Sequence, residues 1–396
     1  MGPRRILEFF ALALRFSLVC SQGNAVVSIP VRDTFVLPPT FVSNYSQKFV
    51  DTVVPNGTVE NLLLQAQNAT YITYDAEFSA IIGSSPQIQL LAGPLDVGFA
   101  YEAGVYIPGQ NLVWFTGAEI DGPGRVVMAI NLTDHEVYKP KLTEPVITAN
   151  GGSYYEGKVY ITHFGNRTYA GGVVAIDPLT GETTTLVNSY FGVRLNGPDD
   201  VIWAERGENR AMFFTDVDFA SALNLTGPPA LPNAVWRFDP QAESLQAVIP
   251  RSDISKPNGI AVSPGYTKLY ITDTPLSGLQ GMGPGNTTGS AAVYVYDLDD
   301  TLTPVGKRLF SIARTGVPDG IKVDKRGRIW TGEGEGIVVR NDGGKVLGTF
   351  NARTLLEDKN SHLANFAFAD DRLIVLAVNQ IWSIQLAQVV GWTSDS

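Results

Sequence analysis

The sequence predicts an all-β protein, a six-bladed β-propeller in which an N-terminal arm closes the last blade. One module recurs six times: an oxygen-bearing side chain, a short alternating strand, a turn and a second, more apolar strand. The clearest copies begin at Asn258 (PNGIAV, then KLYIT) and Asp319 (PDGIKV, then RIWT). Self-similarity at a period of tens of residues is typical of repeat folds, and four strands per repeat are typical of propeller blades.

Each repeat supplies an inner strand, a second strand and a third strand. The inner strands begin at Glu102, Asn150, Asp199, Asn258, Asp319 and Asn365. The second strands are expected at Leu112–Thr116, Lys158–Thr162, Ala211–Thr215, Lys268–Thr272, Arg328–Thr331 and Arg372–Leu376. The third strands are expected at Val126–Ile130, Val173–Asp177, Val235–Asp239, Val293–Asp297, Ile337–Asn341 and Ile381–Ile384.

Five repeats also offer a fourth strand, for example Thr183–Val187, Leu245–Ile249 and Val346–Phe350, but the sixth runs out of chain after Leu386. The alternating segment Gln87–Ala92 precedes the first repeat and has no other place in the pattern. We expect it to form the missing outer strand, because this pairing closes the ring and removes an open sheet edge.

Two other β architectures fit the repeats less well. A β-sandwich does not need six related modules, and a parallel β-helix repeats over a much shorter period. Residues 26–95 are expected to form the arm and closing strand, with a strand and helical turn at Tyr71–Gly83, and residues 96–390 the propeller.

Composition limits the function classes. The chain has 396 residues, of which 17% are charged and 44% hydrophobic, as in globular proteins. Its net charge of −10, without a long basic run, argues against a nucleic-acid partner. The sequence indicates no oligomeric state.

The N-terminus is typical of a signal peptide over residues 1–25, with Arg4 and Arg5 before an apolar run. The run is too short to span a membrane comfortably, so no membrane attachment is expected after signal removal. The only cysteine, Cys20, lies in this segment. Seven glycosylation sequons support a secreted, extracellular protein: Asn44, Asn56, Asn68, Asn131, Asn166, Asn224 and Asn286.

The six inner-strand positions should meet around the propeller axis, where they would form a ring of three carboxylates and three amides. Buried carboxylates are costly unless a cation neutralises them. Oxygen-only ligands favour Ca²⁺, with Mg²⁺, Mn²⁺ and Zn²⁺ as alternatives, although the ring lacks the His/Cys cluster of a typical zinc site. For Asn150 and Asn365, hydrogen bonding between blades is an equally good interpretation.

Several motifs carry a resemblance to a known family. They are Tyr101-Glu102-Ala103, Asn196-Gly197-Pro198-Asp199-Asp200, Pro257-Asn258-Gly259 and Pro318-Asp319-Gly320. In this order they resemble the SMP-30/gluconolactonase/LRE-like family, and within it the secreted fungal lactonohydrolases, over roughly residues 70–386. The resemblance implies a catalytic divalent metal on the axis, with Glu102, Asp199, Asn258 and Asp319 as its ligands.

Two residues depart from the family pattern. The second metal ligand is usually Asn, where this chain has Asp199, and the fungal branch usually has His where this chain has Tyr101. The extra charge at Asp199 should strengthen cation binding and weaken the metal as a Lewis acid. Tyr101 removes an imidazole that would transfer protons or bind substrate.

The remaining site candidates follow from these positions. Asp319 is our candidate general base, since a carboxylate beside the metal can accept a proton from water. His163 ends a second strand and is a second catalytic candidate, and His362, just before the sixth inner strand, is similar to it. Repeated Thr-Asp pairs such as Thr215-Asp216 are more typical of turns and inter-blade hydrogen bonds. The expected substrate-binding residues are Tyr101, Asn150, Asn196 and Asn365.

The sequence thus predicts a secreted, calcium-dependent lactone hydrolase that opens an aldonolactone or a related lactone to the hydroxy acid. One alternative is a hydrolase or biosynthetic tailoring enzyme of the same fold that acts on another ester, including phosphotriesters. The other is a propeller that binds metal and a ligand without catalysis.

Overall fold

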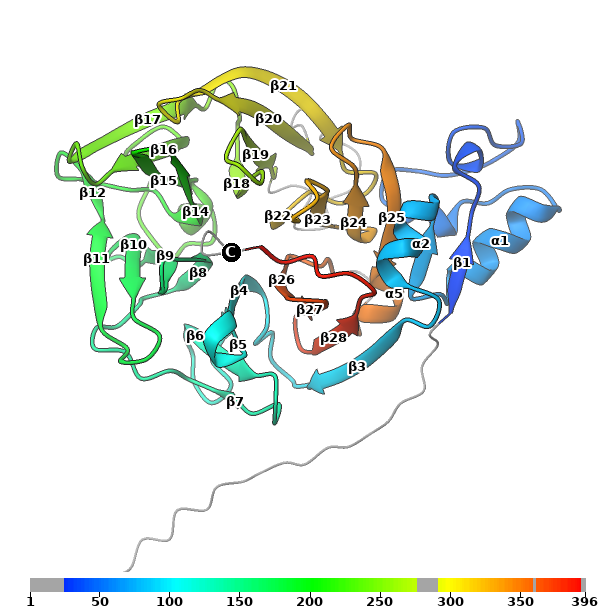
Figure 1. The fold of residues 1–396 in the computed structure, drawn as a ribbon, viewed down its shortest axis with the longest axis horizontal. Helices are drawn as coiled ribbons and strands as arrows, with labels where there is room; N and C mark the ends of the chain where they lie inside the picture. Colours follow the sequence, from blue (N-terminus) through cyan, green and yellow to red (C-terminus); the bar gives the residue numbers. More distant parts are fainter. Residues whose placement is uncertain (1–24, 276–290, 359–360, 393–396) are drawn as a thin grey trace, which may run out of the picture.

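The structure is a computed structural model, and it describes residues 25–275, 291–358 and 361–392. Six sheets of mainly antiparallel strands surround a common axis, which confirms the predicted six-bladed propeller (Figure 1). The predicted signal peptide, residues 1–25, lies outside the described residues except for Ala25, and Asn286 also lies outside them. The described part of the chain has no helix with the length and apolar character needed to span a lipid bilayer.

The first three blades follow one another along the chain. Blade 1 contains β4 (Glu102–Ile107), β5 (Leu112–Ala118), β6 (Arg125–Asn131) and β7 (Val137–Tyr138). Blade 2 contains β8 (Ala149–Tyr155), β9 (Lys158–Gly165), β10 (Ala170–Ile176) and β11 (Thr183–Val187). Blade 3 contains β14 (Pro198–Arg206), β15 (Asn209–Asp216), β16 (Ala234–Asp239) and β17 (Ser244–Pro250). The hairpin of β12 (Ser189–Tyr190) and β13 (Val193–Arg194) connects blades 2 and 3.

The last three blades complete the ring. Blade 4 contains β18 (Pro257–Val262), β19 (Lys268–Asp273), β20 (Ala292–Leu298) and β21 (Pro304–Ile312). Blade 5 contains β22 (Ile321–Val323), β23 (Ile329–Glu333), β24 (Gly336–Arg340) and β25 (Val346–Asn351). Blade 6 contains β26 (Asn365–Ala369), β27 (Arg372–Leu376), β28 (Ile381–Gln385) and β3 (Gln87–Ala92).

The closing strand lies where the sequence predicts it. β3 pairs antiparallel with β28, with Leu90 opposite Trp382 and Ile88 opposite Ile384. Ile88 packs on an apolar cluster shared by blades 5 and 6, while its neighbour Gln89 is exposed. An N-terminal strand therefore completes the C-terminal blade.

The rest of the arm extends blade 5, which the repeat pattern did not predict. β2 (Tyr71–Thr73) pairs with β25, and β1 (Val26–Ser28) pairs parallel with β2, so this sheet has six strands. Helix α2 (Ala76–Ile82) inserts Phe78 against Phe350, and α1 (Thr58–Ala66) covers a separate apolar cluster of the arm. Figure 1 shows the arm beside β25, outside the ring.

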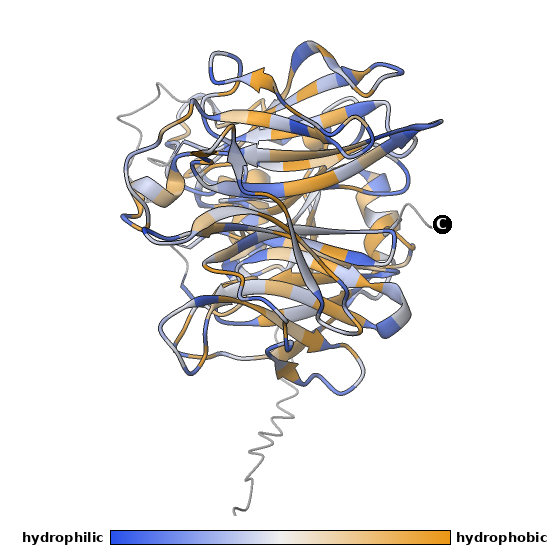
Figure 2. Cartoon of the chain, turned by 90° about the vertical axis from the view of Figure 1, so that its left-hand side faces the viewer, coloured by the Kyte–Doolittle hydropathy of each residue, from blue (hydrophilic) through white to orange (hydrophobic). Residues whose placement is uncertain are grey.

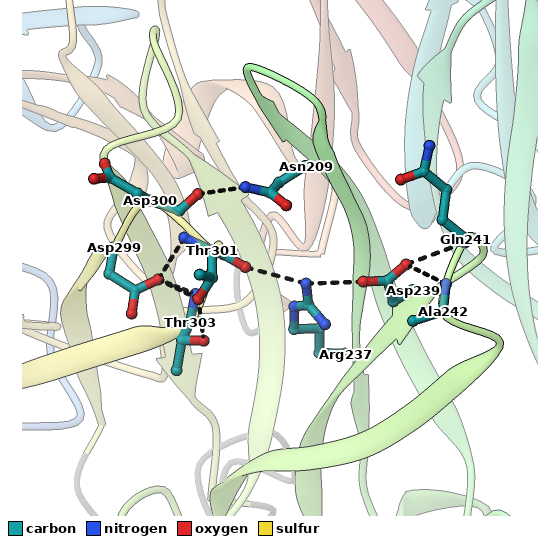
Figure 3. A network of polar contacts seen from close by, with 9 residues as sticks. All are labelled: Asn209, Arg237, Asp239, Gln241, Ala242, Asp299, Asp300, Thr301 and Thr303. Atoms are coloured by element: carbon teal, nitrogen blue, oxygen red, sulfur yellow. Dashed lines mark hydrogen bonds and ion pairs between the residues drawn. The ribbon is translucent and has the colours of Figure 1, made fainter.

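Apolar clusters between neighbouring blades form the core, because the inner strands of the blades are buried on both faces. Orange and blue segments alternate along the strands in Figure 2. Polar contacts connect blade 3 to the turn between β20 and β21 of blade 4 (Figure 3). Arg237 of β16 donates to the carbonyl of Thr301 at 3.1 Å, and Asn209 donates to the carbonyl of Asp300 at 2.8 Å.

Candidate metal centre

The six predicted axial side chains lie together as a ring in which carboxylates and amides alternate from blade to blade. All six residues are at most 6% exposed. Each amide donates to the carboxylate of the following blade: Asn150 to Asp199, Asn258 to Asp319 at 2.8 Å, and Asn365 to Glu102 at 3.2 Å. The six axial side chains therefore form three amide–carboxylate pairs, each between two neighbouring blades.

Bulges at the start of the inner strands present these residues to the axis. The strand register shifts between Glu102 and Val105, and equivalent shifts follow Ala149, Pro198 and Pro257. Such bulges bend a strand and change the direction of a side chain. Ala103, at φ 70°, holds a left-handed conformation immediately after Glu102, and this backbone is unusual for a residue with a side chain.

Small residues beside the axial positions allow the inner strands to approach each other. A Cβ on Gly259 would lie 2.3 Å from the carbonyl oxygen of Asp319, and one on Gly151 would lie 1.8 Å from Oδ1 of Asp200. Glycine at both positions is therefore a steric requirement of the ring, since real contacts are never this short.

A threonine near the end of the second strand holds the neighbouring blade in register. In four blades this hydroxyl donates to the backbone carbonyl of the next axial residue: Thr116 to Asn150, Thr162 to Asp199, Thr215 to Asn258 and Thr272 to Asp319. Asp216, which follows Thr215, accepts from the backbone amides of Asn196 and Gly197. The threonines thus make inter-blade hydrogen bonds, as the sequence predicts, whereas Asp216 holds the entry to the inner strand of its own blade.

Electrostatics at the ring is dominated by buried negative charge. Burial raises the pKa of Glu102 well above its usual range, and the charges of Asp319 and Asp199 raise it further. Burial, with Asp200 and Asp319 nearby, also raises the pKa of Asp199. The three buried carboxylates thus repel each other, and a cation would relieve this repulsion.

The donor set fits a hard divalent cation. In the described ranges, no three His, Cys, Asp or Glu side chains are placed so that they could hold a metal by themselves. Amide oxygens would therefore have to complete the coordination. The predicted set of Glu102, Asp199, Asn258 and Asp319 provides such a mixture, and it contains only oxygen donors.

His362 is the imidazole that lies next to Asp319. Its Nε2 atom is 3.1 Å from Oδ2 of Asp319 and 3.3 Å from the hydroxyl of Tyr101. The guanidinium of Arg125 lies 5.6 Å from the centre of the Tyr101 ring. Tyr101 and His362 thus form a chain of polar contacts that ends on the carboxylate of Asp319. The fungal family pattern has a histidine at the position of Tyr101, so here His362 supplies the imidazole of this region.

The two other predicted side chains of the site have local partners. His163 is buried opposite Ala149, beside the ring, and burial lowers its pKa, with a hydrogen bond to the backbone of Ile147 opposing this shift. The side chain of Asn196 donates to the carbonyl of Leu231 at 2.8 Å and accepts from its amide at 3.2 Å. Both polar groups of Asn196 therefore hold the chain that precedes β16.

A cavity of about 520 Å³ follows the inner strands away from the ring. Asp200 and Lys322 line it together with aromatic residues such as Trp203. Burial raises the pKa of Asp200 to about 7 although Lys322 opposes the shift. Trp392 packs on Tyr266 at this end of the channel, and the C-terminal segment lies over the ring centre in Figure 1.

Six predicted sequon positions fall in the described ranges, and all of them lie at the surface. Asn44, Asn56, Asn68 and Asn224 are exposed, and Asn131 and Asn166 are partly exposed. Glycosylation at these positions stays a prediction.

Comparisons with known proteins agree with this geometry. The family model described as the SMP-30/Gluconolactonase/LRE-like region matches residues 102–354. The chain is 28% identical over 312 residues to the lactonohydrolase oryL of Aspergillus oryzae, covering 74% of this chain and 70% of that protein.

Solved structures share the fold. A gluconolactonase structure from Xanthomonas campestris superposes with a TM-score of 0.63 at 23% identity, covering 80% of this chain and 95% of its own. The calcium-binding protein regucalcin from Agrobacterium tumefaciens superposes with a TM-score of 0.55 at 18% identity, covering 78% and 96%. With its matched propeller repeats and axial motifs, this chain belongs to the SMP-30/gluconolactonase/LRE-like family.

Proposed function

We propose that the protein is a secreted, calcium-dependent lactone hydrolase that opens an aldonolactone or a related lactone to the hydroxy acid. The observation that carries the proposal is the buried carboxylate of Asp319. One of its oxygens accepts a hydrogen bond from Asn258 of the ring, and the other contacts His362. The names of the lactonohydrolase and gluconolactonase relatives support this reaction class, and the name of regucalcin supports calcium.

Glu102, Asp199, Asn258 and Asp319 would hold the cation. When bound there, a divalent metal supplies Lewis acidity at the lactone carbonyl and neutralises the developing oxyanion. Asn150, Asn365 and Tyr101 surround these residues and are the proposed contacts for substrate oxygens. Asn196 is a weaker candidate, because its side chain already holds the backbone of Leu231.

The proton transfers use the Asp319–His362 contact. Asp319 accepts a proton from water as the water oxygen bonds to the carbonyl carbon. The ring C–O bond then breaks, and the alkoxide leaving group takes up the proton through His362, which leaves a hydroxy acid. His163 stays the second candidate for the proton acceptor, although its contacts place it beside Ala149 rather than Asp319.

An assay of a substrate panel with and without chelator tests the proposal. Purified protein is given aldonolactones of five- and six-membered ring size, an aryl ester and a phosphotriester, and acid release is followed at constant pH. We expect lactone hydrolysis that EDTA abolishes and Ca²⁺ restores. Turnover of only the ester or the phosphotriester would favour the other hydrolase of this fold, and metal binding without any turnover would favour the non-catalytic propeller.

A further inference from the structure

A second cavity lies between the arm and blade 5, away from the axial ring. Its volume is about 580 Å³, and none of its lining residues belongs to the ring. The arm supplies one wall with Phe35, Phe41 and Phe49, and Ile312 of β21 contributes from blade 4. Phe35 is 72% exposed and Ile312 is 67% exposed, so two large apolar side chains that line the cavity are largely accessible to solvent.

The floor of this cavity contains a buried ion pair. Glu333 is fully buried, and its Oε1 atom accepts from Arg340 at 2.7 Å and from Thr331 at 2.6 Å. Among the residues that the structure describes, the other oxygen, Oε2, has no hydrogen-bond partner. A buried carboxylate oxygen without a partner is costly, so a donor that reaches it would gain a charge-assisted hydrogen bond.

The charges around the cavity define the donor. Lys345 lines the cavity but is paired with Asp75, so its charge is already neutralised. The remaining bases, Arg314 and Arg340, balance the acids Glu333 and Glu335, which gives 2 − 2 = 0 when all are ionised. A charged ligand would upset this balance, whereas a neutral hydroxyl would not.

The basic side chains that line the cavity already have hydrogen-bond or ion-pair partners. Arg314 donates to the carbonyl of Gln47 at 2.6 Å and to the hydroxyl of Ser43 at 2.8 Å, and Lys345 bonds Asp75. Arg340 bonds Glu333. The free acceptor on Glu333 is therefore the polar feature that an incoming molecule would use.

We infer that this cavity is a binding site for a small, neutral amphipathic molecule, with an apolar body against the arm and a hydroxyl donated to Glu333. The site is independent of the proposed lactone hydrolysis, because it shares no residue with the axial ring. Its residues join the arm to blades 4 and 5, so an occupant would also hold the arm against the propeller.

The probe pair is n-octanol and its isomer heptyl methyl ether, which has the same atoms but no donor. Titration calorimetry on the full chain should show saturable octanol binding with one site and about tenfold weaker binding of the ether, the usual effect of one lost hydrogen bond. In Glu333→Gln the amide NH₂ replaces the free acceptor, so the ratio of the octanol affinity to the ether affinity should fall to about one. Equal binding of both probes to the unaltered protein would overturn the inference.

Two exposed positions on β21 give a control that does not depend on the ion pair. Ile312 lines the cavity, whereas Leu309, 61% exposed on the same strand, does not. Octanol should shift the tryptophan emission of Ile312→Trp saturably and leave the emission of Leu309→Trp unchanged. No saturable change in Ile312→Trp would show that the cavity holds only water.

Discussion

The two oxygens of Asp319 face different partners: Oδ1 accepts from the amide of Asn258 at 2.8 Å, and Oδ2 lies 3.1 Å from Nε2 of His362. One oxygen is thus part of the ring and the other is part of a side chain network that leads to Tyr101. Under the proposed function, this division would separate a metal-holding role from a proton-transfer role within one carboxylate. The two roles can be tested separately.

Asp319→Asn keeps an oxygen ligand of nearly the same shape but cannot accept a proton at neutral pH. Metal affinity should fall modestly, while kcat for the lactone should fall by ~10²–10⁴. The measurement is turnover at saturating Ca²⁺, with folding checked by circular dichroism. Asn258→Ala is the matched control: it should lose metal affinity and recover part of its activity at high Ca²⁺. Near-normal kcat in metal-saturated Asp319→Asn would restrict Asp319 to metal binding.

His362→Asn tests the imidazole beside Asp319. We expect kcat to fall by roughly 10² because the side chain that returns the proton is lost, with metal affinity little changed. His135→Asn is the control, since His135 lies in the turn between β6 and β7. If His163→Asn lowered kcat and His362→Asn did not, the proton path would have to be assigned to His163.

Removal of the metal should destabilise the fold. A ligand that binds only the native state at a hundred times its Kd contributes about 2.7 kcal/mol, and here its loss also exposes Glu102, Asp199 and Asp319 to mutual repulsion. Thermal unfolding is measured in EDTA, with metal content checked by mass spectrometry, and again after Ca²⁺ or Mg²⁺ is added back. An unchanged Tm in verified metal-free protein would exclude a structural metal in the ring.

Closure of the ring is tested at the β3–β28 pair. Ile88→Asp places a charge against the apolar cluster of blades 5 and 6 and should lower the free energy of unfolding by ~2 kcal/mol or more. Gln89→Asp changes the neighbouring exposed position and should have little effect. The readout is the urea midpoint, together with light scattering for association at the uncovered edge. Equal midpoints for the two variants would contradict the role of β3.

Glu335 should make stability depend on pH. Burial raises the pKa of Glu335 to about 7, and Arg314 and Lys48 only partly oppose the shift while Glu333 adds to it. Since the folded pKa is above the unfolded one, the stabilising contribution is full below about pH 4.5 and is lost as the pH rises through about 7.

The variant Glu335→Gln should therefore be less sensitive to pH between these limits, by ~1–3 kcal/mol in the free energy of unfolding. Urea unfolding at several pH values measures this, and Glu182→Gln at an exposed position should keep the original profile. A profile for Glu335→Gln that parallels that of the unaltered protein would show that Glu335 ionises normally.

Repetition explains what the sequence predicts well. Inner, second and third strands recur, so errors in one copy are corrected by the others, and the missing strand after Leu386 indicates the place of Gln87–Ala92. The six axial positions follow from the same register. Their alternation into amide–carboxylate pairs is visible only once the blades are arranged around an axis.

Features outside the repeat were harder to predict. The addition of β1 and β2 to blade 5 depends on a contact across most of the chain and has no internal copy. His163 and His362 were similar candidates in sequence, and only the three-dimensional contact with Asp319 separates them. Asn196 has a motif position typical of a site residue, but its partner Leu231 lies in a connection without a recognisable pattern.

The pairing of β3 with β28 also has a consequence for biosynthesis. Gln87–Ala92 leaves the ribosome before any blade, and its partner Ile381–Gln385 leaves after all six inner strands. The first five blades can form in order as they emerge, but the circle cannot be completed until Ile381–Gln385 has also emerged. A chain truncated before Ile381 would keep most of its strands and still lack a closed ring, so closure is a late event in the synthesis of this protein.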